Sequence, residues 1–108
     1  MKKSMDKIRI NSCDIAYEDS RGNGEALLFL NGVAMTIAHW SPMATELSRD
    51  FRCISHDFRG QLLSGKPEDG YSLRGHADDV KALMDHLEIR QAHIVGTSYG
   101  AEIGMVFA

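Results

Sequence analysis

The residues with the clearest potential for chemistry form a five-residue turn near the end of the 108-residue chain, Gly96-Thr97-Ser98-Tyr99-Gly100. This segment fits the pattern G-x-S-x-G, in which a serine stands at a sharp turn from a strand into a helix. The two glycines leave room for strand and helix to approach, and the helix N-terminus supplies unpaired N–H groups and a partial positive charge. Such a serine could attack a carbonyl carbon, and the N–H of Tyr99 would meet the resulting oxyanion. The pattern alone also fits an incidental serine in a glycine-rich turn.

The turn needs a strand before it and a helix after it, and the flanking residues predict both. His93-Ile94-Val95 is a short apolar strand, and a helix is predicted from Ala101 to Ala108. Upstream, the unbroken apolar run Ala26–Leu30 is typical of a strand that is covered on both faces, as in a parallel sheet. Phe51–Ser55 predicts a second strand of this kind.

Two helices are predicted between these strands. Ser41-Pro42 signals a helix start, with serine as the cap and proline in the first position, and this helix should run to about Ser48. Ser72 can cap the second helix. Its apolar residues recur at helical spacing: Leu73, Ala77, Val80, Leu83, Met84 and Leu87.

A β-hairpin is predicted ahead of these elements. Ile8 and Ile10 alternate with polar residues before the turn formers Asn11-Ser12, and Ile15 and Tyr17 do so after them. The order is then hairpin, strand, helix, strand, helix, strand, helix. Strands that alternate with helices predict an α/β fold with right-handed crossovers and a parallel sheet.

Several segments, taken with the serine turn, resemble the α/β-hydrolase fold family. Leu28–Gly32 resembles the strand and oxyanion loop of that family, and Trp40 stands where the family often has tryptophan. His56–Ser64 resembles the family loop Asp-x-Arg-Gly-x-Gly-x-Ser, and Ser72–Leu87 resembles the helix before the nucleophile strand. The spacing of these segments also matches. Within the family the pattern is most similar to small esterases and lactonases of the 3-oxoadipate enol-lactonase type.

The resemblance implies a serine hydrolase that acts on a small-molecule ester or lactone through an acyl-enzyme, with no cofactor. It makes Ser98 the nucleophile, gives the oxyanion hole to the N–H groups of Tyr99 and Val33, and places Asn31 and Gly32 along the pocket. Dehalogenases and epoxide hydrolases of this fold use an aspartate nucleophile, so a serine at position 98 argues against both.

Three residues depart from the family pattern. Asn31 stands where histidine is common, although asparagine also occurs in the lactonase-like branch. Gln61 and Leu62 replace the usual histidine or phenylalanine and glycine. These changes weaken any assignment of substrate and leave the nucleophile assignment unaffected.

The acid and the base of a catalytic triad are not found among these residues. In this fold they follow the serine in the order acid, then histidine, but all five histidines precede Ser98: His39, His56, His76, His86 and His93. We expect His76 and His86 to face solvent, His93 to be packed or at a sheet edge, and His39 to be able to line the pocket. Asp57 is expected to order its loop together with Arg59 rather than to act in catalysis.

The length also indicates an incomplete domain. Domains of this architecture run to roughly 200–250 residues, so residues 1–108 are expected to be the N-terminal part of a single α/β-hydrolase domain, with the acid and base beyond Ala108. The strand His93–Val95 would keep an open edge, through which the isolated chain could self-associate. The apolar residues of the last helix would be poorly covered: Ile103, Met105, Val106 and Phe107.

Other functions stay open on this sequence. Acyl transfer and cofactor-free perhydrolysis use the same residues, some members of the fold act as ligand receptors, and the chain could be a non-catalytic truncated remnant. A net charge of −3 does not favour nucleic acid or an anionic membrane as partner. No apolar run is long enough to span a bilayer, and no signal peptide is evident. Cys13 and Cys53 are too few and too far apart for a disulfide framework or a metal site, which indicates reduced thiols in a cytoplasmic protein.

Overall fold

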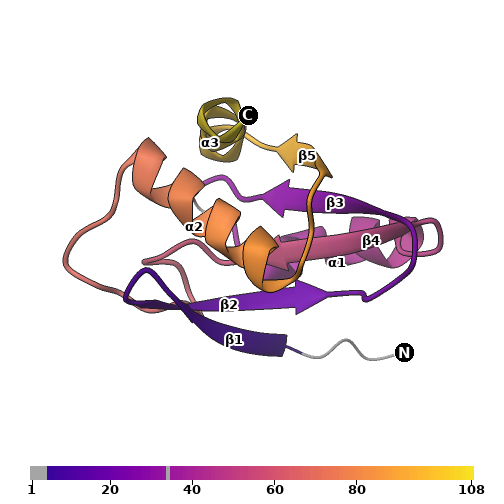
Figure 1. Cartoon of the computed structure of the whole chain (residues 1–108), viewed down its shortest axis with the longest axis horizontal. Coiled ribbons are helices and arrows are strands. Elements are labelled where there is room, and N and C mark those ends of the chain that lie inside the picture. The colour runs from indigo at the N-terminus through magenta and orange to yellow at the C-terminus, as the bar shows by residue number, and fades with distance from the viewer. Residues whose placement is uncertain (1–4, 34) are drawn as a thin grey trace.

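The computed structural model describes residues 5–33 and 35–108 and contains one five-stranded sheet with helices on both faces. Its elements follow the predicted order (Figure 1). They are β1 (Met5–Ile10), β2 (Cys13–Asp19), β3 (Glu25–Leu30), α1 (Ile37–Leu47), β4 (Phe51–His56), α2 (Leu73–His86), β5 (Ala92–Gly96) and α3 (Tyr99–Phe107). The predicted α/β fold is therefore confirmed.

The predicted hairpin is formed by β1 and β2, which pair antiparallel with Ile10 opposite Cys13. Asn11 and Ser12 connect them with φ values of 48° and 64°. Two central residues with positive φ make a turn whose twist matches that of the flanking strands. The hairpin joins the rest of the sheet through β2, which pairs antiparallel with β4.

The strand order is β1-β2-β4-β3-β5, and β3 pairs in parallel with both β4 and β5. Parallel strands all end at the same edge of the sheet, so the loops after β3, β4 and β5 gather there. Among the described strands β5 pairs with β3 alone, which confirms the predicted open edge beside His93–Val95.

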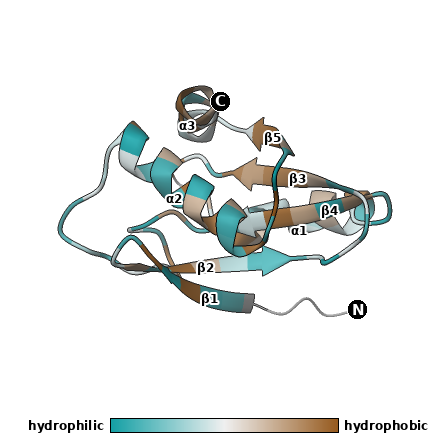
Figure 2. Ribbon diagram, in the orientation of Figure 1, coloured by the Kyte–Doolittle hydropathy of each residue, from teal (hydrophilic) through white to brown (hydrophobic). Residues whose placement is uncertain are grey.

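Both faces of β3 are buried, as its unbroken apolar run predicted. Leu28 and Leu30 pack with Ile54 beneath α2 and α3. Leu27 and Phe29 face the opposite side, where the Trp40 ring of α1 stacks on Phe29 at 4.8 Å between ring centroids. Figure 1 shows α2 in front of the sheet and α1 behind it, and Figure 2 shows the apolar colouring of β3, β5 and α3.

The predicted start of the first helix at Ser41-Pro42 is wrong. Helix α1 begins at Ile37, with Thr36 as its cap, and Pro42 lies inside it. The N–H of Ile37 donates to Asp57 Oδ1 at 2.9 Å, and the N–H of Thr36 donates to His39 Nδ1 at 3.0 Å. These two bonds satisfy backbone donors at a start that lies before the Ser41-Pro42 signal, with the cap at Thr36 instead of Ser41.

The last helix also differs from the prediction. It begins at Tyr99 rather than Ala101, immediately after the serine. Ile103 was expected to be poorly covered, but this residue of α3 is fully buried, and Phe107 is half-buried. Met105 and Val106 are exposed, as predicted. Helix α3 therefore packs its own apolar face against β3 and α2.

No helix among residues 5–33 and 35–108 is both long enough and apolar enough to cross a membrane.

Candidate active site

Ser98 lies at the tip of the turn between β5 and α3, in a backbone conformation that few residues adopt. Its φ is 53° and its ψ is −115°, whereas Tyr99 is already helical. A non-glycine residue held in such a sparsely populated region typically carries about 1–3 kcal/mol of strain, and such strain concentrates at functional sites. The Ser98 side chain is exposed at the edge of the sheet where the parallel strands end.

The glycines on either side of Ser98 are required by close backbone contacts. A Cβ at Gly100 would collide with Leu30 O and lie 2.6 Å from Asn31 O. A Cβ at Gly96 would lie 2.8 Å from the backbone of Gly100. The two glycines therefore allow β5, α3 and the end of β3 to converge on the serine.

Helix α3 directs its first backbone donors toward this turn. The Ser98 carbonyl accepts bonds from Ala101 N at 2.9 Å and Glu102 N at 3.2 Å, so the serine carbonyl is already part of the helix. Tyr99 is the first helical residue, and helix geometry gives its N–H no partner within the helix. An oxyanion near Ser98 would meet this donor and the positive end of the helix dipole.

The loop after β3 runs beside the serine turn. A Cβ at Gly32 would lie 3.4 Å from Thr97 O, so these two backbones are near contact. Val33, the next residue, is 74% exposed. Val33 and Tyr99, the two predicted oxyanion donors, both line a hollow of about 270 Å³. Its other lining residues are Phe58, Arg59, Gly60, Gln61, Tyr71 and His76.

Asn31 and Gly32 are not among the residues that line this hollow, although both were expected to line the pocket. The Asn31 side chain is fully buried and is engaged within the protein. Its Nδ2 donates to His56 O and Gln61 Oε1, each at 2.9 Å, and its Oδ1 accepts from Trp40 Nε1 at 2.5 Å. Asn31 thus connects β3, β4 and α1 beneath the loop.

His76 does not face solvent, so that prediction is wrong. It is 5% exposed, and its ring lies 5.5 Å from the Tyr99 ring and 5.1 Å from that of Phe58. The sequence contained the signal, because His76 lies four residues before Val80 and seven before Leu83 on the apolar stripe. Burial lowers the pKa of the His76 imidazole, which favours the neutral ring.

The other four histidines lie on four different elements, β4, α1, α2 and β5. His56 is fully buried at the end of β4, and burial lowers its pKa to about 4. His39 is exposed at the start of α1, His86 is exposed on α2 as predicted, and His93 is exposed on the edge strand β5 as predicted. None of these rings forms a hydrogen bond with Ser98 within the described residues. Residues 5–33 and 35–108 therefore contain no histidine that is hydrogen-bonded to Ser98.

Asp57 holds the loop after β4, as expected, but its partners are backbone groups rather than Arg59. Its carboxylate accepts from Ile37 N at 2.9 Å and Leu63 N at 3.1 Å. Arg59 pairs instead with Asp79 of α2, at 2.7 Å and 2.9 Å, and both side chains are almost fully buried. This hydrogen-bonded pair raises the pKa of the Arg59 guanidinium. Arg59 therefore fixes the loop to α2 and presents no free charge to the hollow.

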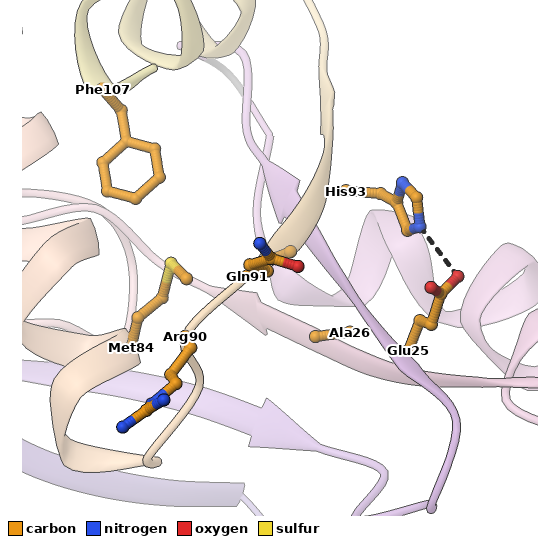
Figure 3. A pocket seen from close by; sticks show the side chains of 8 residues that line it. Glu25, Ala26, Met84, Arg90, Gln91, His93 and Phe107 are labelled. Atoms are coloured by element: carbon orange, nitrogen blue, oxygen red, sulfur yellow. Dashed lines mark hydrogen bonds and ion pairs between the residues drawn. The ribbon is translucent and has the colours of Figure 1, made fainter.

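A larger hollow, of about 490 Å³, lies at the other end of the sheet, where β3 and β5 begin. Figure 3 shows Met84, Arg90 and Phe107 around this hollow. On the side opposite Met84 and Arg90, His93 Nε2 lies 3.1 Å from Glu25 Oε1, within hydrogen-bonding distance. The hollow holds no group of the serine turn. No cluster of side chains that could hold a metal ion was found among residues 5–33 and 35–108.

Comparison with known proteins agrees with this geometry. The alpha/beta hydrolase fold family matches residues 25–108. The 2-(acetamidomethylene)succinate hydrolase of Mesorhizobium japonicum is 40% identical over 81 residues, which is 75% of this chain and 29% of that protein. The chain thus spans less than a third of that relative's length.

Solved structures superpose over nearly the whole chain. The enol-lactonase from Burkholderia xenovorans gives a TM-score of 0.89 at 28% identity, covering 95% of this chain and 41% of that one. The epoxide hydrolase VrEH1 from Vigna radiata also gives 0.89, at 26% identity, covering 97% of this chain and 35% of that one. The family profile and these superpositions show that the chain belongs to the alpha/beta hydrolase fold family.

Proposed function

We propose that this chain is the nucleophile-bearing part of a serine hydrolase that acts on small esters or lactones through an acyl-enzyme. The observation that carries the proposal is the backbone of Ser98, held at φ 53° between two glycines that cannot accept a Cβ. A protein has little reason to keep such strain at an exposed serine unless the presentation of its hydroxyl is used.

The reaction follows from this arrangement. Ser98 Oγ attacks the substrate carbonyl, its proton passes to a general base, and the carbonyl oxygen becomes an oxyanion that Tyr99 N–H and Val33 N–H stabilise. The tetrahedral intermediate collapses to an acyl-serine and expels an alkoxide, which takes the proton from the base. Water then attacks the acyl-serine, and its proton passes to the same base. The second tetrahedral intermediate collapses to release the acid product, and Ser98 Oγ takes the proton back from the base. With a lactone, the alcohol leaving group stays attached to the acyl group.

The base and its acid partner are proposed to come from residues outside 1–108, with residues 1–108 as the N-terminal part of one domain. The resemblance implies this, and the distribution of histidines supports it, because none of them is hydrogen-bonded to Ser98 within the described residues. For residues 1–108 alone we expect negligible esterase activity, since a serine hydroxyl without a base is a poor nucleophile.

The nucleophile type separates this proposal from the other reactions found among similar proteins. The enol-lactonase and the epoxide hydrolase superpose equally well, so the fold does not choose between them. The side chain at position 98 does, because an epoxide hydrolase or dehalogenase of this fold would need a carboxylate there. Serine favours acyl chemistry on an ester or lactone.

The experiment is hydrolysis of p-nitrophenyl acetate and of a small lactone by the full-length protein that contains these residues. We expect the full-length protein to turn over these substrates. Ser98→Ala should abolish turnover, whereas Thr97→Ala, which removes the neighbouring hydroxyl, should leave it largely unchanged. Absence of turnover together with tight binding of a small ligand would support a ligand-binding protein instead. Absence of both in a folded protein would support a non-catalytic remnant.

A further inference from the structure

Gln61, in the loop after β4, contacts the oxyanion loop with every polar atom of its side chain. Its Nε2 donates to Gly32 O and Val33 O, each at 3.1 Å. Its Oε1 accepts from Asn31 Nδ2 and Phe58 N, each at 2.9 Å. A glutamine amide has two N–H donors and two acceptor lone pairs, so these four bonds use its full capacity.

These bonds determine how the peptide before Val33 is oriented. A trans peptide is planar, and its C=O and N–H point in opposite directions. Gly32 O and Val33 N belong to the same peptide, so holding Gly32 O toward Gln61 directs Val33 N–H away from Gln61. Gly32 O also accepts from Met35 N at 3.1 Å, which fixes the same carbonyl a second time.

The side chain of Val33 gives the loop little support of its own. It is 74% exposed, so packing contributes little to its position. The carbonyl of Val33 is bound by Gln61 as well, so one side chain holds the carbonyls of two consecutive residues, Gly32 and Val33. No other side chain among the described residues donates to both carbonyls.

We propose that Gln61 is a positioning residue that sets the direction of the Val33 N–H and thereby completes the oxyanion hole. The inference rests on the proposed function, because it assigns a use to Val33 N–H in ester or lactone cleavage. It also gives a role to a residue that departs from the usual family pattern. Glutamine supplies two donors from one nitrogen to the loop, whereas phenylalanine supplies none and a neutral imidazole ring supplies one.

Gln61→Glu in the full-length protein separates this role from general loop support. A carboxylate keeps the acceptors for Asn31 and Phe58 N but loses both donors to the oxyanion loop. Since outright loss of one oxyanion donor lowers kcat by about 10²–10³, we expect misdirection of Val33 N–H to lower kcat by about 10- to 100-fold. KM should stay within about twofold, because the donor acts on the transition state. Affinity for a boronic acid transition-state analogue should fall in parallel with kcat.

Leu62→Ala is the matched control, since this neighbouring side chain is 65% exposed and makes no bond to the oxyanion loop in the described structure. It should leave kcat, analogue affinity and melting temperature unchanged. The ratio of wild-type kcat to Gln61→Glu kcat should also shrink when the pH is low enough to protonate the introduced carboxyl. The protonated carboxyl then regains one donor. A purely structural role would lower the melting temperature without this pH-dependent recovery of kcat.

The outcomes distinguish the two proposals. Turnover that depends on Ser98 but is unchanged in Gln61→Glu would overturn the role of Gln61 and leave the proposed function standing. Turnover that survives Ser98→Ala would overturn both the role of Gln61 and the proposed function. The same holds if the wild-type full-length protein shows no turnover. As a readout independent of turnover, amide hydrogen exchange over residues 31–35 should accelerate in Gln61→Glu and not in Leu62→Ala, and unchanged exchange would also contradict the inference.

Discussion

Gly100, in the first turn of α3, packs directly against the carbonyl oxygen of Leu30 at the end of β3, and a Cβ at this position would collide with that oxygen. This contact brings the turn that carries Ser98 against the strand that leads into the loop of Gly32 and Val33. Because the neighbouring atoms belong to the backbone, they cannot move aside by a change of rotamer.

Gly100→Ala in the full-length protein should therefore lower the free energy of unfolding. We expect a loss at or above the upper end of the about 1–3 kcal/mol that overpacking usually costs, measured by urea denaturation. The matched comparison is Gly104→Ala in the same helix, whose Cβ would meet the Ile94 Cγ2 methyl at 3.1 Å rather than a backbone oxygen. A shift of a few tenths of an ångström would relieve that contact, and helix propensity favours alanine over glycine, so this substitution should cost less than Gly100→Ala. Equal effects of the two substitutions would contradict the close approach at Gly100.

Replacement of Ser98 should reveal the strain stored at the turn. Glycine adopts the conformation of Ser98 without a Cβ clash, whereas alanine retains the clash. Relief of about 1–3 kcal/mol of strain, less the roughly 0.4–1 kcal/mol that glycine costs through the unfolded state, predicts that Ser98→Gly is more stable than Ser98→Ala by about 1 kcal/mol. Both variants should lack turnover. A thermal melt in which Ser98→Gly is the less stable of the two would show that the turn is not strained.

Stability should depend on pH through His56. Burial lowers its pKa in the folded protein to about 4 from an ordinary value of 6.5, so the unfolded chain binds the proton more readily. The stabilisation is complete above about pH 6.5 and is lost as the pH falls toward 4. One unit of pKa difference between the folded and unfolded states is worth about 1.36 kcal/mol, so the loss reaches up to about 3 kcal/mol. His76, whose pKa is also lowered, contributes in the same direction.

His56→Leu should flatten the slope of unfolding free energy against pH between 6.5 and 4, because one titrating group is removed. Ile54→Val on the same strand is the control, since it removes a buried methyl group but no titrating group, and it should leave the slope unchanged. A slope that is identical in wild type and His56→Leu would refute a buried neutral His56.

Residues 1–108 on their own should self-associate, precipitate or fold only in part. β5 pairs on one side alone within the described sheet, and an unpaired strand edge is a template for another chain. Light scattering after size exclusion should give a mass above that of the monomer. Met105→Lys places a charge on the exposed face of α3. If the chains associate through the β5 edge, this variant should still form the oligomer. A monodisperse monomer that unfolds cooperatively would contradict this prediction.

The parts of the fold that could be predicted from the sequence are those whose signals are local. The turn formers Asn11-Ser12 specified the hairpin, and the unbroken apolar run in β3 specified a strand buried on both faces. The start of α1 could not be predicted in this way. It depends on Asp57, twenty residues further along the chain, whose carboxylate accepts the Ile37 N–H, and a local Ser-Pro signal does not register such a contact.

The candidate site shows the same division. Its five-residue pattern predicted the sharp turn at Ser98 because glycine spacing reflects local backbone geometry. The bonds from Gln61 to the carbonyls of Gly32 and Val33 could not be predicted, since the bonded residues lie 29 and 28 positions apart in the sequence. The pairing of Arg59 with Asp79 is likewise a tertiary contact between a loop and a helix.

The central claim, that Ser98 is the nucleophile, is tested most directly by reaction of the full-length protein with a fluorophosphonate probe, followed by peptide mapping. We predict one adduct per chain, on Ser98 Oγ, which is absent in Ser98→Ala and retained in Thr97→Ala. A folded protein that forms no adduct, or an adduct that persists in Ser98→Ala, would contradict it.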